Sequence, residues 1–408
     1  MVRPERRTRG DLIAAAAIAA VIAVVIAMFW WHSSARATTF RPASGPAPNI
    51  KAAQGVPENL QQRWTVASPK TLAPVIAAGT VVTGDGSTVE GRDPQTGENR
   101  WLYARDRELC AVSYVYDLAV AVYPDVRGCG QVSSIKAGTG QRGPTRTSYS
   151  DKQVVVTSDG SAVLSYGPTR LEMWRSDLVR MLSYGEIDAP IKPVNTGLGE
   201  GCALMSASAS DTSAAVLEAC PGERDLRLNL LKPAKEEDEP DSKQVKLPGL
   251  AVDSDARVLA VSGTTAAVYL PSPDPEVAVY DETGNKVSGT PLRIPPAPAG
   301  AAPAVTRTGD WITWWTGSAV MVFDKKLDYR YTVEGTGPLR ALGPAVVMAG
   351  RLLIPVEGGL AVYDPANGAQ ERLIPIEHPP GMGAIIPAVV GSTVIEQRGQ
   401  ALTGYGPA

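Results

Sequence analysis

Few side chains in this sequence could act as an acid, a base or a nucleophile. Histidine occurs only twice, as His32 and His378, and a Ser-His-Asp triad needs an imidazole to accept the serine proton. His378 stands in the run Glu377-His378-Pro379-Pro380, and no Gly-x-Ser-x-Gly motif accompanies it. We therefore interpret His378 as a loop histidine. The sequence predicts no catalytic residue and no enzymatic activity.

Carboxylates recur at the tips of short turns between apolar runs. Five of them would share one rim if each turn occupied the same place in a repeated unit: Asp85, Asp125, Asp159, Asp274 and Glu357. Carboxylate oxygens suit calcium, and their charge suits a basic segment of a partner protein. Aspartate is also an ordinary turn residue, and that interpretation needs no ligand. Calcium is thus the one metal that the pattern suggests, and no residue is assigned as a metal ligand.

Four cysteines point to the redox state of the compartment. Cys110 and Cys129 are 19 residues apart, and Cys202 and Cys220 are 18 apart. Of the three connectivities that four cysteines allow, the local one joins Cys110 to Cys129 and Cys202 to Cys220. No Cys-x-x-Cys motif indicates zinc. We expect two local disulfides, which persist in an oxidising compartment.

An apolar segment near the N-terminus would carry the chain to such a compartment. Residues 12–31 contain no charge and no proline, and a helix of this length spans about 30 Å, the hydrocarbon thickness of a bilayer. Trp30 and Trp31 end the segment, where aromatic rings favour the membrane interface. The arginines that precede it are Arg3, Arg6, Arg7 and Arg9. The positive-inside rule predicts a cytoplasmic basic tail (1–11), a signal anchor in the cell membrane (12–31) and an extracytoplasmic remainder.

A cleaved signal peptide is the alternative, because Ala35-Arg36-Ala37 resembles a cleavage site. The apolar segment is longer than the usual core of a signal peptide, which favours the uncleaved anchor. Residues 32–58 are rich in Pro, Ala and Ser and show no hydrophobic periodicity, which is typical of a tether.

The charge balance narrows the class of partner. Lys and Arg number 39 and Asp and Glu 42, a net charge of −3, whereas a nucleic-acid binder needs a basic face. We therefore expect that no nucleic acid is a partner. The basic tail and the anchor imply that the partners are envelope or membrane proteins. They also imply that residues 12–31 contact the lipid bilayer. The charged run 231–246 is interpreted as a solvated insertion.

From residue 59 onwards, short apolar strands alternate with turns rich in Gly, Asp and Pro; the clearest units span residues 77–101 and 348–376. Second strands are expected to begin near Thr80, Leu118, Gln153, Ser213, Val258, Trp311, Leu352 and Thr393. Eight units in 350 residues give about 44 residues each, the size of a four-stranded propeller blade. The sequence predicts an all-β fold over residues 59–408, an eight-bladed β-propeller. Seven blades are the alternative if residues 167–250 hold one blade fewer.

The last unit lacks an outer strand, since the chain stops after residues 401–406. The segment 61–66, which contains Trp64, precedes the first unit and looks like an outer strand without a sheet. Pairing the two segments would close the ring and satisfy edges that otherwise promote aggregation.

The pattern Asp-x-x-Thr-Gly-x-x-x-Trp, at Asp93, Thr96, Gly97 and Trp101, resembles the pyrroloquinoline-quinone-like (PQQ-like) repeat; it is complete only in the first unit. As a whole the chain is similar to membrane-anchored PQQ-like propellers of actinobacterial envelopes, and distantly similar to BamB, a lipoprotein propeller of outer-membrane assembly that acts as a protein-binding scaffold. The resemblance implies structural roles: Thr96 and Gly97 shape a turn, and Trp101, with Trp64 as its counterpart, packs between blades. Quinoprotein enzymes of the family add adjacent cysteines, which this chain lacks, so neither PQQ nor another cofactor is expected.

These observations predict a membrane-tethered, extracytoplasmic propeller that serves as a non-catalytic scaffold or adaptor in the cell envelope. A quinone- or metal-dependent enzyme, or a ligand sensor that uses the central funnel, is the alternative. A fold of this kind does not by itself identify the ligand or partner.

Overall fold

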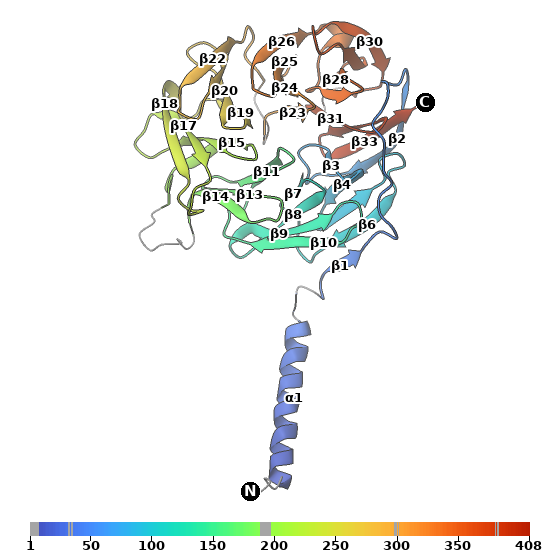
Figure 1. Ribbon diagram of the computed structural model, residues 1–408, viewed down its shortest axis with the longest axis vertical. Helices are drawn as coiled ribbons and strands as arrows, with labels where there is room; N and C mark the ends of the chain where they lie inside the picture. The colour runs from blue at the N-terminus through green and yellow to red at the C-terminus, as the bar shows by residue number, and fades with distance from the viewer. Residues whose placement is uncertain are drawn as a thin grey trace.

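The computed structural model describes residues 8–31, 33, 36–187, 197–297, 300, 302–379, 381 and 383–408. Its strands form eight antiparallel sheets around a central axis (Figure 1). Each sheet is one blade, and its strands are called first to fourth from the axis outwards. The eight-bladed propeller predicted from the repeat is confirmed.

The blades follow one another in chain order. Blade one contains β3 (Val75–Ala77), β4 (Thr80–Asp85), β5 (Thr88–Arg92) and β6 (Asn99–Ala104), and blade two contains β7 (Ala111–Val115), β8 (Leu118–Asp125), β9 (Gly128–Lys136) and β10 (Arg142–Thr147). Blade three contains β11 (Val155–Ser158), β12 (Val163–Tyr166), β13 (Arg170–Trp174) and β14 (Arg180–Gly185). Blade four contains β15 (Ala203–Ala209), β16 (Ala214–Ala219), β17 (Asp225–Lys232) and β18 (Asp241–Ala251). Blade five contains β19 (Arg257–Ser262), β20 (Thr265–Leu270), β21 (Glu276–Tyr280) and β22 (Lys286–Pro291). Blade six contains β23 (Val305–Thr308), β24 (Trp311–Trp315), β25 (Ala319–Asp324) and β26 (Tyr329–Glu334). Blade seven contains β27 (Val346–Met348), β28 (Arg351–Val356), β29 (Gly359–Tyr363) and β30 (Gln370–Pro375). A short 3₁₀ helix (Gly337–Leu339) follows β26.

Blade eight closes the ring with strands from both ends of the propeller sequence. β31 (Ile385–Val390), β32 (Thr393–Arg398) and β33 (Ala401–Pro407) are its first three strands, and β2 (Leu60–Ala67) is the fourth. β2 pairs antiparallel with β33 along its length, from Leu60 opposite Pro407 to Ala67 opposite Ala401. The predicted closure by residues 61–66 is therefore present.

Two of the expected second-strand starts are wrong. Gln153 precedes β11 and Val258 lies in β19, and both of these are first strands. The first and second strands of a blade are both short apolar runs, so the rhythm of the sequence gives the number of blades but not the order of strands within each one.

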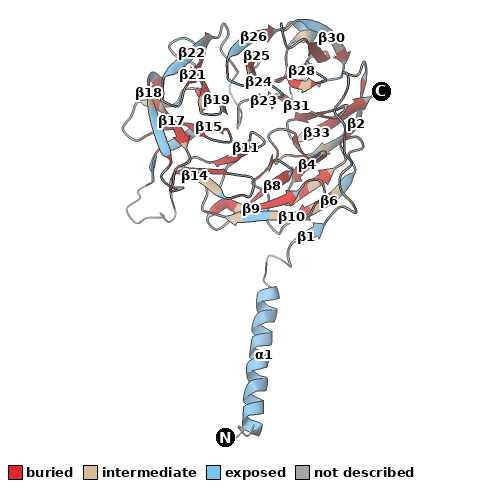
Figure 2. Ribbon diagram, in the orientation of Figure 1, coloured by how far each residue is buried: buried red, intermediate tan, exposed pale blue. Residues whose placement is uncertain are grey.

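The core lies between the blades rather than in a single centre (Figure 2). In one cluster, Val82 and Trp101 of blade one pack with Ala121 and Tyr123 of blade two. Strands such as β29 are buried at every position, because neighbouring sheets cover both of their faces.

Side chains of fourth strands fasten one blade to the next by donating to backbone carbonyls. Trp64 Nε1 donates to Pro94 O at 3.0 Å, and Trp101 Nε1 donates to Ala137 O at 2.6 Å. The other contacts of this type are Arg146 Nη1 to Leu178 O (2.8 Å), Tyr331 Oη to Pro365 O (2.9 Å) and Arg372 Nη2 to Val56 O (2.6 Å). The carbonyl lies in the third-to-fourth turn of the next blade, or, for Val56, just before the strand that completes blade eight.

The repeat motif shapes the turn that receives such a side chain. Asp93 Oδ1 accepts from the backbone N–H groups of Gln95 and Thr96, and Gly97 adopts φ 72°. A Cβ at Gly97 would lie 2.5 Å from Trp64 Cγ. Glycine is thus required both by the left-handed backbone and by the tryptophan from blade eight.

The helix α1 (Arg9–Trp31) precedes the propeller. A stretch of 18 residues within it has a mean hydropathy of 3.0, and its 23 residues make it long and apolar enough to cross a membrane, by composition a membrane anchor or a signal sequence. Thr8 and Asp11 form a capping box at its start, since Thr8 N donates to Asp11 Oδ2 at 2.8 Å. Most of the predicted basic tail (residues 1–7), and Ala35 of the cleavage-site alternative, lie outside the described residues.

The segment interpreted as a tether (residues 32–58) contacts the propeller from Thr39 onwards. β1 (Thr39–Arg41) pairs with β6 and adds a fifth strand to the outer edge of blade one. Beyond it, Ala47 N donates to Gly138 O at 2.8 Å, and Arg100 Nη2 donates to Pro46 O at 2.9 Å. Backbone hydrogen bonds need no hydrophobic periodicity, so the sequence pattern did not reveal this attachment.

The charged run 231–246 is solvated only in part: residues 241–244 are exposed, but the middle of the run is not free. Its middle lies against blade three, where Ser183 N donates to Glu237 O at 2.7 Å and Arg180 Nε donates to Glu237 Oε2 at 2.6 Å. Asp238 is only 3% exposed. The acidic run is held because a cation of β14 lies opposite it.

Candidate functional site

The two faces of the propeller differ in what covers them. The turns between first and second strands and between third and fourth strands lie on one face, which we call the covered face because residues 43–57 cross it. There Ala47 binds Gly138 of blade two, and Ile50 lies against Gly391 of blade eight. The opposite face carries the second-to-third turns and the connections between blades, and we call it the open face.

The carboxylates predicted to share one rim are divided between these faces. Asp85, Asp125, Asp274 and Glu357 lie in second-to-third turns, on the open face. Asp159 lies between β11 and β12, the first and second strands of blade three, so its predicted place on the same rim is wrong. The error follows from taking β11 as a second strand, because successive turns of an antiparallel sheet lie on opposite sides.

The four carboxylates on the open face do not converge. They belong to blades one, two, five and seven. Asp125 accepts from Arg127 N and Gln131 Nε2; burial works against its ionisation, but these hydrogen bonds and nearby arginines lower its pKa. Among the described residues, the group with metal-ligand spacing is Cys202, Glu218 and Cys220, whose sulfurs are in a disulfide. Calcium binding at the rim stays a prediction, because these four carboxylates do not lie close enough together to form a common ligand set.

Both cysteine pairs lie within single blades. Cys110 is joined to Cys129 in blade two and Cys202 to Cys220 in blade four, with Cα–Cα distances of 6.1 and 4.2 Å. The described chain has no free cysteine, so no thiol is present there to act as a nucleophile.

His378 lies in the connection between β30 and β31, and its side chain is fully buried. Its Nδ1 is 2.6 Å from Val356 O, and its Nε2 is 3.2 Å from a Glu396 oxygen. Arg398 donates to the same carboxylate. Within the described chain no hydroxyl or thiol hydrogen-bonds to His378, so the imidazole has a structural contact on both nitrogens.

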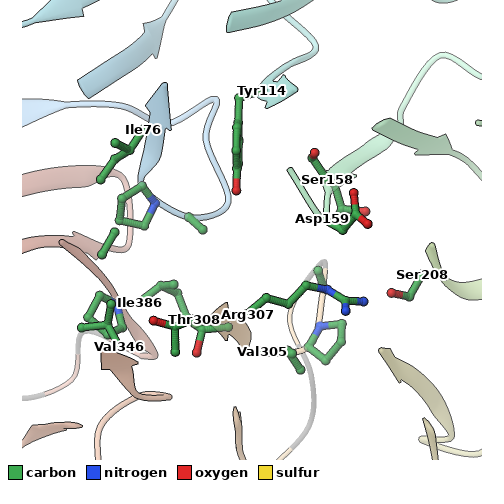
Figure 3. A pocket seen from close by; sticks show the side chains of 18 of the residues that line it. Ile76, Tyr114, Ser158, Asp159, Ser208, Val305, Arg307, Thr308, Val346 and Ile386 are labelled. Carbon is green, nitrogen blue, oxygen red and sulfur yellow. The ribbon is translucent and has the colours of Figure 1, made fainter. Parts of the chain in front are cut away.

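The central channel holds a polar cavity of about 460 Å³ toward the covered face. Arg307 of β23 and Asp159 are its only charged lining residues within the described part of the chain. Tyr114 of β7 and Ser208 of β15 stand beside them (Figure 3). Four different blades therefore supply these side chains.

Arg307 is fixed across two blade junctions. Its Nη2 donates to Val261 O at 2.5 Å and to Ala209 O at 3.4 Å. Burial lowers the pKa of Arg307, and the charge of Asp159 opposes that shift. Burial and the charge of Asp159 likewise raise the pKa of Tyr114. The guanidinium is thus a positioned, partly buried cation.

A second cavity, of about 680 Å³, continues the channel to the open face. Its walls are largely apolar and include Val75, Val112 and Val156 from the starts of first strands. Leu72, in the connection from β2 to β3, also lines it and is 42% exposed. Trp315 at the end of β24 lines another side. The open face therefore has an apolar mouth at its centre.

The fold is similar to that of solved propeller structures. BamB from Moraxella catarrhalis superposes with a TM-score of 0.52 and 14% identity, over 85% of this chain and 99% of that chain. Sqt1 from Saccharomyces cerevisiae superposes with a TM-score of 0.51 and 8% identity, over 88% of this chain and 100% of that chain. No family model matches the sequence, and no curated protein matches it. At these identities the similarity shows the propeller fold alone.

Proposed function

We propose that this chain is a membrane-tethered, extracytoplasmic scaffold that docks a partner protein of the cell envelope on its open face. The apolar mouth of the channel carries this proposal, because exposed apolar surface framed by polar loops is typical of protein-binding sites. The resemblance of the sequence to BamB, a protein-binding scaffold, agrees with this proposal. No described constellation of nucleophile, base and orienting group competes with this interpretation.

The open face is favoured over the covered face because the chain itself occupies part of the latter. Residues 43–57 contact the turns of blades one, two and eight and end near Arg372 of blade seven. On the open face, Leu72 lies at the mouth of the channel with 42% of its surface exposed. A loop of a partner that inserts an apolar side chain there would bury both surfaces.

The place of attachment leaves the open face accessible beside a membrane. Seven residues separate Trp31 from Thr39, and an extended chain covers at most about 3.5 Å per residue. β1 joins the propeller at the outer edge of blade one, not on either face. With α1 as anchor, the edge of the propeller stays close to the bilayer, and a membrane protein can approach the open face from the side.

A photocrosslinker placed at position 72 should capture a discrete partner in native membranes, whereas one at position 116 should not. Tyr116 is the matched control, because it is exposed in a first-to-second turn on the covered face. The adducts are compared by mass spectrometry, and Leu72→Asp should weaken recovery of the partner captured from position 72. Capture from position 116 alone would place docking on the other face, and capture from neither would refute the scaffold.

The extracytoplasmic location predicts a specific thiol state. Protein taken from cells under acid quench should react with a maleimide only after reduction, at all four cysteines, because each described cysteine is in a disulfide. A mass-shift gel separates the species. Four reactive thiols before reduction would indicate a reducing compartment and contradict the proposed topology.

A further inference from the structure

The polar cavity near the covered face has an arrangement that docking on the open face does not explain. Within the described chain, Arg307 makes hydrogen bonds through Nη2 only, and both are to backbone carbonyls. No carboxylate of the described chain lies within 4.0 Å of its guanidinium, so it forms no ion pair there. Arg307 lines the cavity, and its Nε and Nη1 groups make no hydrogen bond within the described chain. Partial burial of a cation without a paired carboxylate is unfavourable, and an anionic ligand would offset that cost.

Asp159 supplies the opposite charge across the same cavity. Its Oδ1 accepts from Ser161 N at 2.8 Å and from Ala162 N at 2.9 Å, which fixes the side chain. Its Oδ2 has no hydrogen-bond partner among the described residues. The hydroxyls of Tyr114 and Ser208 also make no hydrogen bond to the described chain. On the polar side of the cavity, Arg307 could therefore bind an anionic group and Asp159 a cationic group. The two side chains form no ion pair with each other.

The other side of the cavity is apolar. Figure 3 shows Ile76, Val346 and Ile386 on one side, and Asp159, Ser208 and the guanidinium of Arg307 on the other. These apolar side chains come from the first strands of blades one, seven and eight. The volume of about 460 Å³ is within the range of small-molecule sites. A ligand that fits this arrangement has one negative group, one positive group and a compact apolar part.

We propose that the cavity binds a free amino acid with an apolar side chain. Its carboxylate accepts from Nη1 of Arg307, and its ammonium group donates to Oδ2 of Asp159. Its side chain lies against Ile76, Val346 and Ile386. A simple carboxylate would leave Asp159 unpaired, and a simple amine would leave Arg307 unpaired. Binding in this cavity is a property of the chain alone and does not depend on docking at the open face.

Calorimetric titration of the full-length protein in detergent tests this proposal with three probes. L-leucine carries all three groups, 4-methylpentanoate lacks the amine, and 3-methylbutylamine lacks the carboxylate. We expect leucine to bind and each analogue to bind at least about tenfold more weakly, since a hydrogen bond between charged groups is lost. Equal affinity for leucine and an analogue would overturn the zwitterion site. So would the absence of heat with leucine and with phenylalanine at millimolar concentration.

Two variants locate the site, and a third serves as control. Arg307→Gln and Asp159→Asn should each raise the dissociation constant of leucine by about tenfold or more. The asparagine keeps the oxygen that accepts from Ser161 and Ala162, so the turn is retained. Asp274→Asn removes an exposed carboxylate from the open face and should leave the affinity unchanged. Unchanged affinity in both cavity variants, with a native melting curve, would refute the assignment.

Discussion

Deletion of residues 59–68 will yield a protein that aggregates and shows no cooperative melting transition. The deletion removes β2, the fourth strand of blade eight, and leaves the outer edge of β33 without a partner. An unpaired hydrophobic edge is a template for association between chains. The deletion also removes Trp64, whose indole packs on Gly97 and Gly404 and bonds to Pro94 of blade one. Size-exclusion chromatography and circular dichroism melting measure the outcome.

Point substitutions at Trp64 test in smaller steps how much this residue contributes to the stability of the closed ring, and they leave β2 in place. Trp64→Ala should cost about 3–5 kcal/mol of unfolding free energy, as for other buried aromatic truncations. Trp64→Phe keeps most of the buried ring but loses the bond to Pro94 O, at a cost of about 1 kcal/mol or somewhat more. A monomeric deletion variant that melts cooperatively, or a Trp64→Ala variant as stable as the native chain, would show that closure does not depend on this strand.

The number of blades and their closure were predictable because both depend on local signals. Each blade repeats apolar strands and Asp- or Gly-containing turns. Trp64 indicates that residues 61–66 form an outer strand, which must pair with a sheet elsewhere in the chain. The assignment of strands within blade three was not predictable, since β11 and β12 are both short and apolar. Asp159 was consequently placed on the wrong face.

The candidate ligand site was not predictable from spacing. Arg307, Asp159, Tyr114 and Ser208 come from four blades, and their approach depends on the radius of the closed ring. One signal was present in the sequence: Arg307 is a charged residue inside a first strand, β23. A charged residue in a first strand must point into the channel or be paired, and such a residue could have been singled out once the blades were counted.

The attached N-terminal segment escaped prediction for a different reason. Residues 43–57 are held by backbone hydrogen bonds and by arginines of the propeller, among them Arg100 and Arg372. Proline-rich composition indicates an extended chain, but it does not show whether that chain is free or laid on a surface. The same holds for Glu237, whose partner Arg180 lies 57 residues away in the sequence.

Glu172 is the second position where one substitution should have a large effect. It lies in β13 and is 3% exposed. Arg170 and Arg180 donate to its Oε1 at 2.6 and 3.3 Å, and Arg146 and Trp174 donate to its Oε2, each at 2.8 Å. Arg146 also bonds to Leu178 O and so fastens blade two to blade three. One carboxylate therefore serves three arginines at a blade junction.

Glu172→Ala should lower the unfolding free energy by about 3–5 kcal/mol, because it leaves partly buried arginines without their shared counter-charge. Glu172→Gln keeps the volume and most hydrogen-bonding atoms but not the charge, and it should retain most of that loss. Denaturant unfolding at neutral pH measures both. Asp177→Asn is the matched control, since its ion pair with Arg175 is solvent-exposed and should not change stability measurably. A Glu172→Gln variant as stable as the native chain would show that the charge is dispensable.

The pH dependence of the same cluster provides an independent test of its charge. Burial works against ionisation of Glu172, but the charges of Arg146, Arg170 and Arg180 outweigh burial and lower its pKa below the ordinary 4.5. A carboxyl group with a lowered native-state pKa stabilises the fold above its unfolded-state pKa, and that stabilisation is lost as the pH falls through the native-state value. The native protein should therefore lose more unfolding free energy than Glu172→Gln as the pH falls from about 5 through the native-state pKa of Glu172, and the difference between the two curves should shrink over that range. Parallel curves over that range would contradict ionised Glu172 as the centre of the junction.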